Sequence, residues 1–297
     1  MEEGFAEWGG HRTWYGVEGE ISSTTRAPLL TLHGGPGATH DYLLSMTDLA
    51  RDGRAVIFYD QIGNGRSSHY PGRGADFYTV ELFVRELASL VDHLGIGSRY
   101  HLLGQSWGGM LAQEMVLAHP GGIASVVLSN TAASFGDFAL AANALRAELP
   151  PEVDDVLRRH EEEGTTDDPE YEEAVEVFYS RHLCRLPELP AEVKYSFDAI
   201  EEDPTVYHTT NGPSEFHVIG SFKDWSAKDR LGRWPAGLAT LVVGGRHDEA
   251  VPALQTDLQS RIDGAELVIF EDSSHMPFWE EREGYMGVVG GWLRRHD

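Results

Sequence analysis

Ser106 lies in a sequence pattern that predicts a catalytic nucleophile. The stretch LLGQSWGGM (102–110) contains G-x-S-x-G, with an apolar, strand-like run before it and a helical pattern after it. In this context the flanking glycines allow a sharp strand-to-helix turn that exposes the serine hydroxyl at the head of a sheet. The helix N-terminus behind the turn favours developing negative charge. The sequence therefore predicts covalent serine catalysis.

A serine hydroxyl needs a base to activate it, and the base needs an acid to orient it. His275 is the candidate base, because it lies in a loop just after the last expected strand, in ELVIFEDSSHMPFWE (266–280). Two aspartates compete for the acid role. Asp248 follows the strand-like run TLVVGG about one strand–helix–strand unit earlier, whereas Asp272 shares the loop of the histidine. We predict Asp248, which gives the order Ser, Asp, His, one of the known orders of such triads.

A glycine-rich loop could stabilise the negative charge that develops during acyl transfer. The stretch LTLHGGPGATHDY (30–42) follows another strand-like run. Its glycines let backbone N–H groups turn inward without a Cβ in the way, and Pro36 stiffens the loop. We predict that Gly35 donates one oxyanion hydrogen bond and that Trp107, the residue after the nucleophile, donates the other.

Short apolar runs must position these residues. The runs lack clean alternation, which is typical of parallel strands covered on both faces. They are APLLTLH (27–33), AVIFYD (55–60), RYHLLGQ (99–105), IASVVLSN (123–130), ATLVVGG (239–245) and AELVIF (265–270). Helical patterns lie between them, for example at 79–95 and 107–120. The alternation predicts an α/β fold with a mostly parallel sheet and helices on both faces.

The alternation of strands and helices stops in the middle of the chain. From 131 to about 235, helical patterns with polar faces are followed by aromatic-rich loops. We predict that residues 131–235 form a helical cap over the C-terminal edge of the sheet, where open α/β sheets place their ligand sites. The core then consists of residues 1–130 and 236–297. Strand-like residues broken by glycine predict an N-terminal hairpin at 10–23.

The charge balance excludes some partners. There are 48 acidic residues against 23 Lys plus Arg, a net charge of −25, which argues against nucleic acid and anionic membrane surfaces. The acidity could serve solubility alone, or it could attract cationic substrates. The sequence carries no sign of the oligomeric state.

Other features concern location and cofactors. The single cysteine, Cys184, rules out an internal disulfide and fits a reducing compartment. The N-terminal stretch MEEGFAEWGG has no secretory pattern, and no run approaches the roughly 18 apolar residues of a membrane span. No H-E-x-x-H motif or cysteine cluster indicates a metal site. We expect a cytoplasmic protein that needs no metal or other cofactor.

Five motifs carry a resemblance to a known family. They are HGGPG (33–37), YDQIGNGRS (59–67), GQSWGG (104–109), GGRHDEAVP (244–252) and SSHMPFWE (273–280). Together they resemble the proline iminopeptidase family, serine aminopeptidases of the α/β-hydrolase fold that include tricorn-interacting aminopeptidases and amino-acid amidases. The resemblance covers nearly the whole chain. It implies Ser106 as nucleophile with Asp248 and His275 as partners, and Gly35 and Trp107 as oxyanion donors.

A sixth stretch concerns the substrate. TTNGPSEFHV (209–218) resembles the family's NGPxEF stretch. Its glutamate, with the acid after the triad aspartate, binds the free amino terminus of the substrate in related enzymes. The resemblance thus implies Glu215 and Glu249 as amine-binding residues. An ion pair at about 4 Å is worth about 4 kcal/mol at an effective dielectric of 20, before desolvation is subtracted. In the empty site each acid should raise the pKa of the other.

The leading hypothesis is a serine hydrolase that releases one N-terminal residue, proline or another small or apolar one, from a peptide or aminoacyl amide with a free N-terminus. The same site could act on an aminoacyl amide of a small molecule, such as an aminoacylated natural product, which an apolar channel under the cap would favour. An esterase or carbon–carbon hydrolase would use the triad but neither glutamate. A non-enzymatic binding protein is the remaining alternative. The aromatic residues that could line the pocket, or could instead pack in the core of the cap, are Phe135, Phe138, Tyr207, Phe216 and Trp225.

Overall fold

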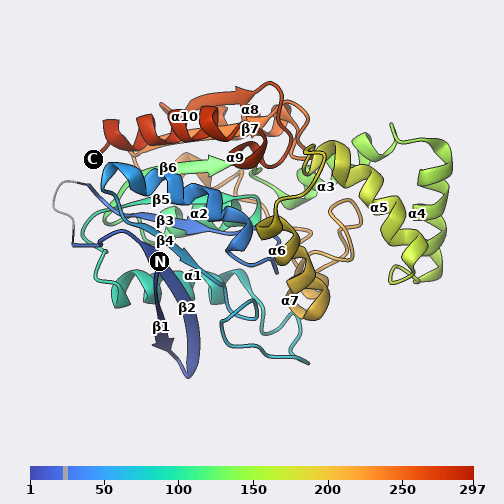
Figure 1. The fold of residues 1–297 in the computed structure, drawn as a ribbon, viewed down its shortest axis with the longest axis horizontal. Coiled ribbons are helices and arrows are strands. Elements are labelled where there is room, and N and C mark those ends of the chain that lie inside the picture. Colours follow the sequence, from blue (N-terminus) through green and yellow to red (C-terminus); the bar gives the residue numbers. More distant parts are fainter. Residues whose placement is uncertain (23–25) are drawn as a thin grey trace.

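The protein is built around one eight-stranded sheet (Figure 1). The computed structural model describes residues 1–22 and 26–297. The strand order is β1-β2-β4-β3-β5-β6-β7-β8; β1 and β2 are antiparallel to their neighbours, and the pairs from β4 to β8 are parallel. The strands are β1 (Glu2–Trp8), β2 (His11–Glu18), β3 (Leu29–Leu32), β4 (Val56–Tyr59), β5 (Tyr100–Gln105), β6 (Ile123–Ser129), β7 (Ala239–Gly245) and β8 (Glu266–Phe270). The predicted mostly parallel α/β sheet is confirmed.

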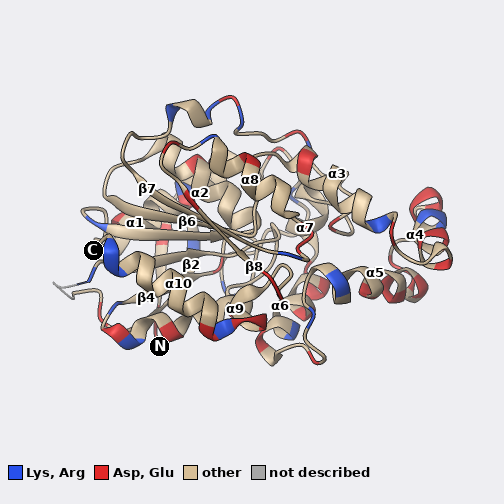
Figure 2. Ribbon diagram, turned by 90° about the horizontal axis from the view of Figure 1, so that it is seen from above, with Lys and Arg blue, Asp and Glu red and all other residues tan. Residues whose placement is uncertain are grey.

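Helices cover both faces of the sheet, as predicted. One face carries α1 (Val80–His93), α2 (Trp107–Ala118) and α8 (Pro252–Ser260) (Figure 2). The other face carries the 3₁₀ segment η1 (Asp41–Asp52) and α10 (Arg282–Arg295), which follows the short helix α9 (Pro277–Glu280). No helix in residues 1–22 and 26–297 is long and apolar enough to cross a membrane.

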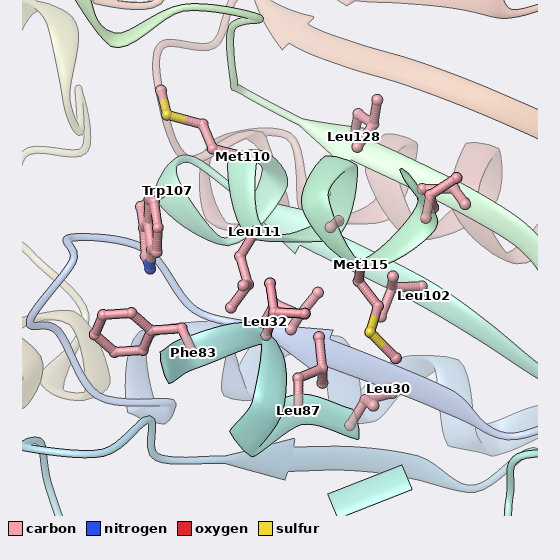
Figure 3. Close-up of a cluster of buried hydrophobic side chains, with 14 of the residues drawn as sticks. Leu30, Leu32, Phe83, Leu87, Leu102, Trp107, Met110, Leu111, Met115 and Leu128 are labelled. Carbon is pink, nitrogen blue, oxygen red and sulfur yellow. The ribbon is translucent and has the colours of Figure 1, made fainter. Parts of the chain in front are cut away.

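Neighbouring apolar residues on one strand enter different cores. Leu30 and Leu32 of β3 belong to the buried cluster that contains Leu111 of α2 (Figure 3). Leu29 of the same strand belongs to the cluster that contains Trp292 of α10. Because both faces of the sheet are buried, the central strands read as continuous apolar runs rather than as alternating ones.

A group of helices occupies the chain between β6 and β7. It lies at the end of the sheet toward which the parallel strands point, with α4 and α5 farthest from the strands (Figure 1). Its helices are α3 (Phe135–Arg146), α4 (Pro151–Glu163), α5 (Pro169–His182), α6 (Ala191–Glu202) and α7 (Thr205–Thr210), followed by the 3₁₀ turn η2 (Leu231–Arg233). We propose that this group is the cap, and its boundaries at 131–235 stay a prediction.

Local sequence sets the bounds of the outer cap helices. Pro151 and Pro169 lie in the first turns of α4 and α5, where a missing N–H costs nothing. The carboxylate of Asp168 accepts a hydrogen bond from the N–H of Glu170 and so caps α5. Gly164, with φ of 67°, ends α4 in the left-handed conformation that glycine adopts without strain.

The N-terminal hairpin lies earlier than predicted. β1 and β2 pair across a turn at Gly9 and Gly10, whose φ angles are 54° and 86°. Two consecutive residues with positive φ suit a tight two-residue hairpin turn. The predicted position, 10–23, contains β2 but not β1, and is therefore wrong. The sequence pattern did not indicate β1, because this edge strand carries charged side chains such as Glu3 and Glu7. The last residue of the predicted range lies outside the described residues.

An ion pair between the buried Arg54 and the partly buried Asp297 holds Asp297 against the segment that precedes β4. Both terminal nitrogens of Arg54, a fully buried residue, donate to the carboxylate of Asp297 at 2.9 Å. Arg26 donates to the same carboxylate at 2.7 Å. Burial alone would raise the pKa of Asp297, but the hydrogen bonds from the two arginines hold it well below its ordinary value.

We predict that Asp297→Ala lowers the free energy of unfolding by about 3 kcal/mol at pH 7, because it leaves Arg54 buried and unpaired. Urea denaturation measures the effect. Since the folded-state pKa of Asp297 is depressed, its contribution is present above the unfolded pKa near 3.9 and is lost as the pH falls below that value. The matched control is Arg295→Ala, which removes the exposed pair with Glu266 and should change stability by less than about 0.5 kcal/mol. Equal effects of the two substitutions would contradict the prediction.

Candidate active site

Ser106 lies at the turn from β5 to α2, with φ of 56° and ψ of −124°. A Cβ on Gly104 would lie 2.1 Å from the carbonyl oxygen of Gly108, and a Cβ on Gly108 would lie 2.1 Å from that of Leu32. Only glycine fits at these two positions, which is why the turn can be so sharp. The sequence thus builds a strained strand-to-helix turn of the kind that presents a nucleophile.

Asp248 and His275 meet in the loops after the neighbouring strands β7 and β8. His275 Nδ1 lies 2.6 Å from Asp248 Oδ1, and both residues are buried. Because a carboxylate only accepts, Nδ1 carries the proton and Nε2 is the nitrogen that can act as a base. Asp272, the competing acid, is exposed to solvent. Ser106 and His275 line the same cavity.

The glycine-rich loop runs against the nucleophile. A Cβ on Gly34 would lie 2.9 Å from the Cβ of Ser106. The N–H of Gly34 itself donates to the hydroxyl of Tyr42 at 2.6 Å, and the next residue, Gly35, lines the cavity. Trp107 is the first residue of α2, where backbone N–H groups have no partner within the helix. Both predicted oxyanion donors are therefore beside Ser106.

His33 and Gln61 join this loop to the nucleophile turn. Burial lowers the pKa of His33 to about 4, so the ring is neutral. Its Nε2 accepts the N–H of Gln61 at 2.9 Å, so Nδ1 carries the proton and donates to the carbonyl oxygen of Gly34 at 3.0 Å. The side chain of Gln61 donates to the carbonyl oxygen of His33 and accepts from Trp107 Nε1 at 2.9 Å.

Tyr42 and Gln105 form a second link. The Tyr42 hydroxyl donates to Gln105 Oε1 at 2.5 Å, and Gln105 Nε2 donates to the carbonyl oxygen of His275 at 3.2 Å. Burial raises the pKa of Tyr42 far above its ordinary value, so the hydroxyl remains a donor. Sequence analysis missed these residues and Gln61. Tyr42 lies in the glycine-rich loop, Gln105 in the nucleophile motif and Gln61 in YDQIGNGRS, and these positions were the only available signal.

Glu249 faces the same cavity without a hydrogen-bond partner. It is fully buried, and among the described residues neither of its carboxylate oxygens is hydrogen bonded. Its Oε1 lies 3.6 Å from His275 Nε2. Burial, and then the negative charges of Glu215 and Asp248, raise the pKa of Glu249 well above its ordinary value.

Glu215 lines the cavity from the cap side. Its Oε1 accepts a hydrogen bond from the hydroxyl of Tyr207 at 2.7 Å. Burial raises the pKa of Glu215 in spite of this hydrogen bond, which acts in the opposite direction. Two glutamates from distant parts of the chain thus meet at one site beside His275.

The cavity has a volume of about 440 Å³ and lies between the sheet edge and the cap. Apart from the polar residues named above, many of its walls are apolar or aromatic. They include Ala38, Tyr171, Val175, Tyr179, Leu183, Phe197, Ile200, Tyr207 and Met276. Acidic residues, among them Glu172, Glu176 and Glu201, also line the cavity, so it combines apolar walls with several polar groups.

Of the five aromatic candidates for lining the pocket, Tyr207 does so. The other four pack in or against apolar cores, which was the alternative for each of them. Phe135 and Phe138 lie in the main apolar core, and Phe216 lies in a small cap core. Trp225 packs against the main core and donates from Nε1 to Glu114. Tyr179 and Phe197 are among the aromatic residues that line the cavity instead.

Comparison with known proteins places these observations in a family. The model of the alpha/beta hydrolase fold matches residues 27–282. The chain is 37% identical to a proline iminopeptidase of Saccharolobus solfataricus, over 97% of this chain and 91% of that protein. It is 35% identical to one of Thermoplasma volcanium, over 99% of this chain and 97% of that protein.

Two solved structures resemble it along their whole length. The crystal structure of VinJ has a TM-score of 0.97 and 44% sequence identity, covering 100% of this chain and 99% of that one. The crystal structure of a proline iminopeptidase from Mycobacterium smegmatis has a TM-score of 0.90 and 42% identity, covering 99% and 98%. The likeness to both extends over the sheet and the helices that follow β6 alike.

Proposed function

Given that the chain belongs to the proline iminopeptidase family of α/β hydrolases, we propose that it releases one N-terminal residue from a peptide or aminoacyl amide with a free amine. The serine aminopeptidases and amino-acid amidases of this family supply the reaction class. In the proposal Ser106 is the nucleophile, His275 is the base, and Asp248 is its orienting acid. Glu215 and Glu249 bind the substrate amine.

The single observation that carries the proposal is the buried carboxyl group of Glu249, which has no hydrogen-bond partner among the residues that the structure describes. A buried acid without a partner costs free energy whether it ionises or not. A substrate ammonium would supply the missing partner. Glu249 Oε1 lies 3.6 Å from Nε2 of His275, the proposed base. An amine bound to Glu249 would therefore be separated from the reacting carbonyl group by about the length of one amino-acid residue. This supports removal of a single residue rather than internal cleavage.

The proposed reaction is serine acyl transfer. Nε2 of His275 takes the hydroxyl proton of Ser106 as the oxygen attacks the carbonyl carbon of the first residue. The N–H groups of Gly35 and Trp107 bind the resulting oxyanion. The carbon–nitrogen bond then breaks, and the leaving amine receives the proton from His275. Water, deprotonated by His275, hydrolyses the acyl-enzyme and releases the amino acid with a restored Ser106.

The raised pKa values predict that substrate binding releases a proton. In the empty site, burial and the acidic neighbours of Glu249 shift its carboxyl group toward the neutral, protonated form. An arriving ammonium favours the ionised form, so up to one proton leaves on binding. Calorimetry of the Ser106→Ala variant with an aminoacyl amide, in phosphate and in Tris, measures the release. Glu249→Gln in the same background should release almost none. Equal binding enthalpies in both buffers would argue against the linkage.

The proposal is tested by following products of a short unmodified peptide with mass spectrometry. We expect the first residue to appear before the second, with no internal fragments. The early appearance of internal fragments would overturn the proposal. So would a protein that cleaves simple esters efficiently but leaves the peptide intact. A set of peptides and amides with varied first residues would then assign the preference between proline and other small or apolar residues.

A second candidate concerns the leaving group. The apolar walls contributed by Val175, Leu183, Phe197 and Ile200 favour an apolar group over a hydrated peptide chain. The same acyl transfer would then remove an aminoacyl group from a small-molecule amide. Paired alanyl amides, one with a long alkyl amine and one with a dipeptide as leaving group, separate the two. A kcat/KM at least tenfold higher for the alkyl amide favours the small molecule, and the reverse ratio favours peptides.

A further inference from the structure

The end of β6 contacts the loops of all three proposed catalytic residues. The N–H of Ser106 donates to the carbonyl oxygen of Ser129 at 3.0 Å. The hydroxyl of Thr131 donates to the carbonyl oxygen of Ser106 at 2.7 Å. Between them, Asn130 contacts the loops that carry Asp248 and His275. Residues 129–131 thus form a common support for the site.

Asn130 bridges the acid and the base through one amide group. Its Nδ2 donates to Asp248 Oδ2 at 2.7 Å and to the carbonyl oxygen of Ser274 at 3.2 Å. Ser274 immediately precedes His275, whose ring contacts the other oxygen of the same carboxylate at 2.6 Å. All four residues are buried, so water does not compete for these hydrogen bonds.

Other donors to Asp248 act more locally. The N–H of Ala250 reaches Oδ1 at 2.9 Å, and Gln255 Nε2 reaches Oδ2 at 3.1 Å. Both donors belong to the chain just after the aspartate. Asn130 comes from a different strand and also contacts the histidine loop. It is therefore the donor that can fix the position of the acid relative to the base.

A relay of hydroxyl groups fixes which way the amide points. The Tyr285 hydroxyl donates to Ser129 Oγ at 3.0 Å, and Ser129 Oγ donates to Asn130 Oδ1 at 2.8 Å. Burial raises the pKa of Tyr285 far above its ordinary value, so the phenol keeps its proton. Because Oδ1 is the acceptor of this relay, the two N–H bonds of the amide must face Asp248 and Ser274.

The backbone explains why asparagine occupies this position. Asn130 has φ of 50°, in the left-handed region that asparagine enters more easily than most residues. Its N–H donates to the carbonyl oxygen of Val243 on β7 at 2.7 Å, which anchors the turn. Glycine would fit the backbone but lacks the side-chain amide that donates to Asp248 and Ser274. Aspartate has the shape of asparagine but would place a second carboxyl group beside Asp248.

We propose that Asn130 is a positioning residue that aligns Asp248 and His275 with Ser106. The inference rests on the proposed triad but does not depend on which substrate is cleaved. Misalignment should slow attack by the serine without weakening capture of the substrate amine, because Asn130 acts through Asp248 and Ser274. A displacement of about 1 Å is enough to reduce a rate by roughly 100-fold.

The test is the rate at which a fluorophosphonate labels Ser106, a reaction that needs the activated serine but no amine binding. We expect Asn130→Gly to be labelled roughly 10- to 100-fold more slowly than the parent, with KM for an aminoacyl anilide within about twofold. The matched control is Gln259→Ala on α8, which removes another side-chain amide that bonds to a carbonyl oxygen, and should be labelled at the parental rate. Thermal unfolding of each variant accompanies the labelling.

Asn130→Asp supplies an independent readout that a purely structural role would not change. The introduced carboxyl group lies beside Asp248, and the titratable groups near this pair include His275, Glu249 and Tyr285. At low pH the two carboxyl groups share a proton, so the introduced group donates as the amide did; at higher pH that proton is lost. The labelling rate relative to the parent should therefore fall as the pH rises from about 6 to 9.

The outcomes separate this inference from the proposed function. A parent protein that is not labelled at Ser106 would overturn the triad and the inference together. If the parent is labelled, two results would overturn the inference alone. One is a labelling rate of Asn130→Gly within twofold of the parental rate; the other is a labelling rate of Asn130→Asp, relative to the parent, that does not change with pH. A lower melting temperature with unchanged labelling would likewise assign Asn130 a merely structural role.

Discussion

Replacing Ser106 by alanine is expected to lower kcat by about 10⁴- to 10⁶-fold and to leave the fold unchanged. The substitution removes the attacking oxygen, and no other residue in the site supplies an equivalent nucleophile in the proposed reaction. The backbone of the turn is set by the glycines on either side of it, so alanine should adopt the same conformation. Steady-state kinetics with an aminoacyl anilide, together with thermal unfolding, measures both effects.

The two aspartates provide the matched comparison for this prediction. Asp248→Asn should reduce kcat by about 10⁴-fold, because the amide no longer holds the imidazole in the tautomer that leaves Nε2 free. Asp272→Asn should leave kcat within about twofold, because Asp272 is exposed. A fully active Ser106→Ala variant, or the opposite order of the two aspartates, would contradict the proposed triad.

Glu249→Gln is expected to have two opposite effects, on catalysis and on stability. It should lower kcat/KM for substrates with a free amine by roughly 100- to 1000-fold, the loss expected for one partly desolvated ion pair. For the same substrates with an acetylated amine, kcat/KM should change by less than about threefold. The matched control is Glu176→Gln at the cavity wall, an exposed acid whose removal should have little effect on either substrate.

The stability effect follows from the raised pKa of Glu249. Its folded-state pKa lies above the unfolded value near 4.3. The group therefore lowers the free energy of unfolding as the pH rises above about 4.3, and the loss is complete above the folded-state pKa. Glutamine resembles the neutral form and removes this penalty. The empty Glu249→Gln variant should therefore unfold at a higher temperature than the parent at pH 8, with a smaller difference at pH 4. A lower melting temperature at pH 8 would contradict the assignment of a buried, unpaired acid.

The features that could be predicted are those that a short sequence motif or a regular pattern of strands and helices determines. The parallel sheet followed from apolar runs covered on both faces, and the Ser106 turn followed from a short motif between a strand and a helix. Contact between Asp248 and His275 could be anticipated because they end adjacent strands. The hairpin at Gly9 and Gly10 was misplaced because its first strand carries an edge pattern of acids.

The residues that support the site through contacts with distant parts of the chain were not predicted. Asn130 matters through Asp248 and Ser274, and Tyr42 matters through Gln105, all of them far away along the chain. Which aromatic residues line the cavity could not be decided from the sequence for the same reason. Phe135, Phe138 and Phe216 have the composition of a pocket lining, but the packing of the cap helices turns them into core and brings others to the cavity.

The central claim is that two glutamates lining the cavity, Glu215 and the buried Glu249, select substrates by their free amine. The most direct measurement is kcat/KM for an aminoacyl anilide and for its N-acetylated counterpart under the same conditions at about pH 7.5, where the reference α-amino group is still largely protonated. The account predicts a preference for the free amine of at least roughly 100-fold, which Glu249→Gln largely abolishes. Equal rates for both anilides in the parent protein would contradict the account and would indicate an esterase or another hydrolase that uses the same triad.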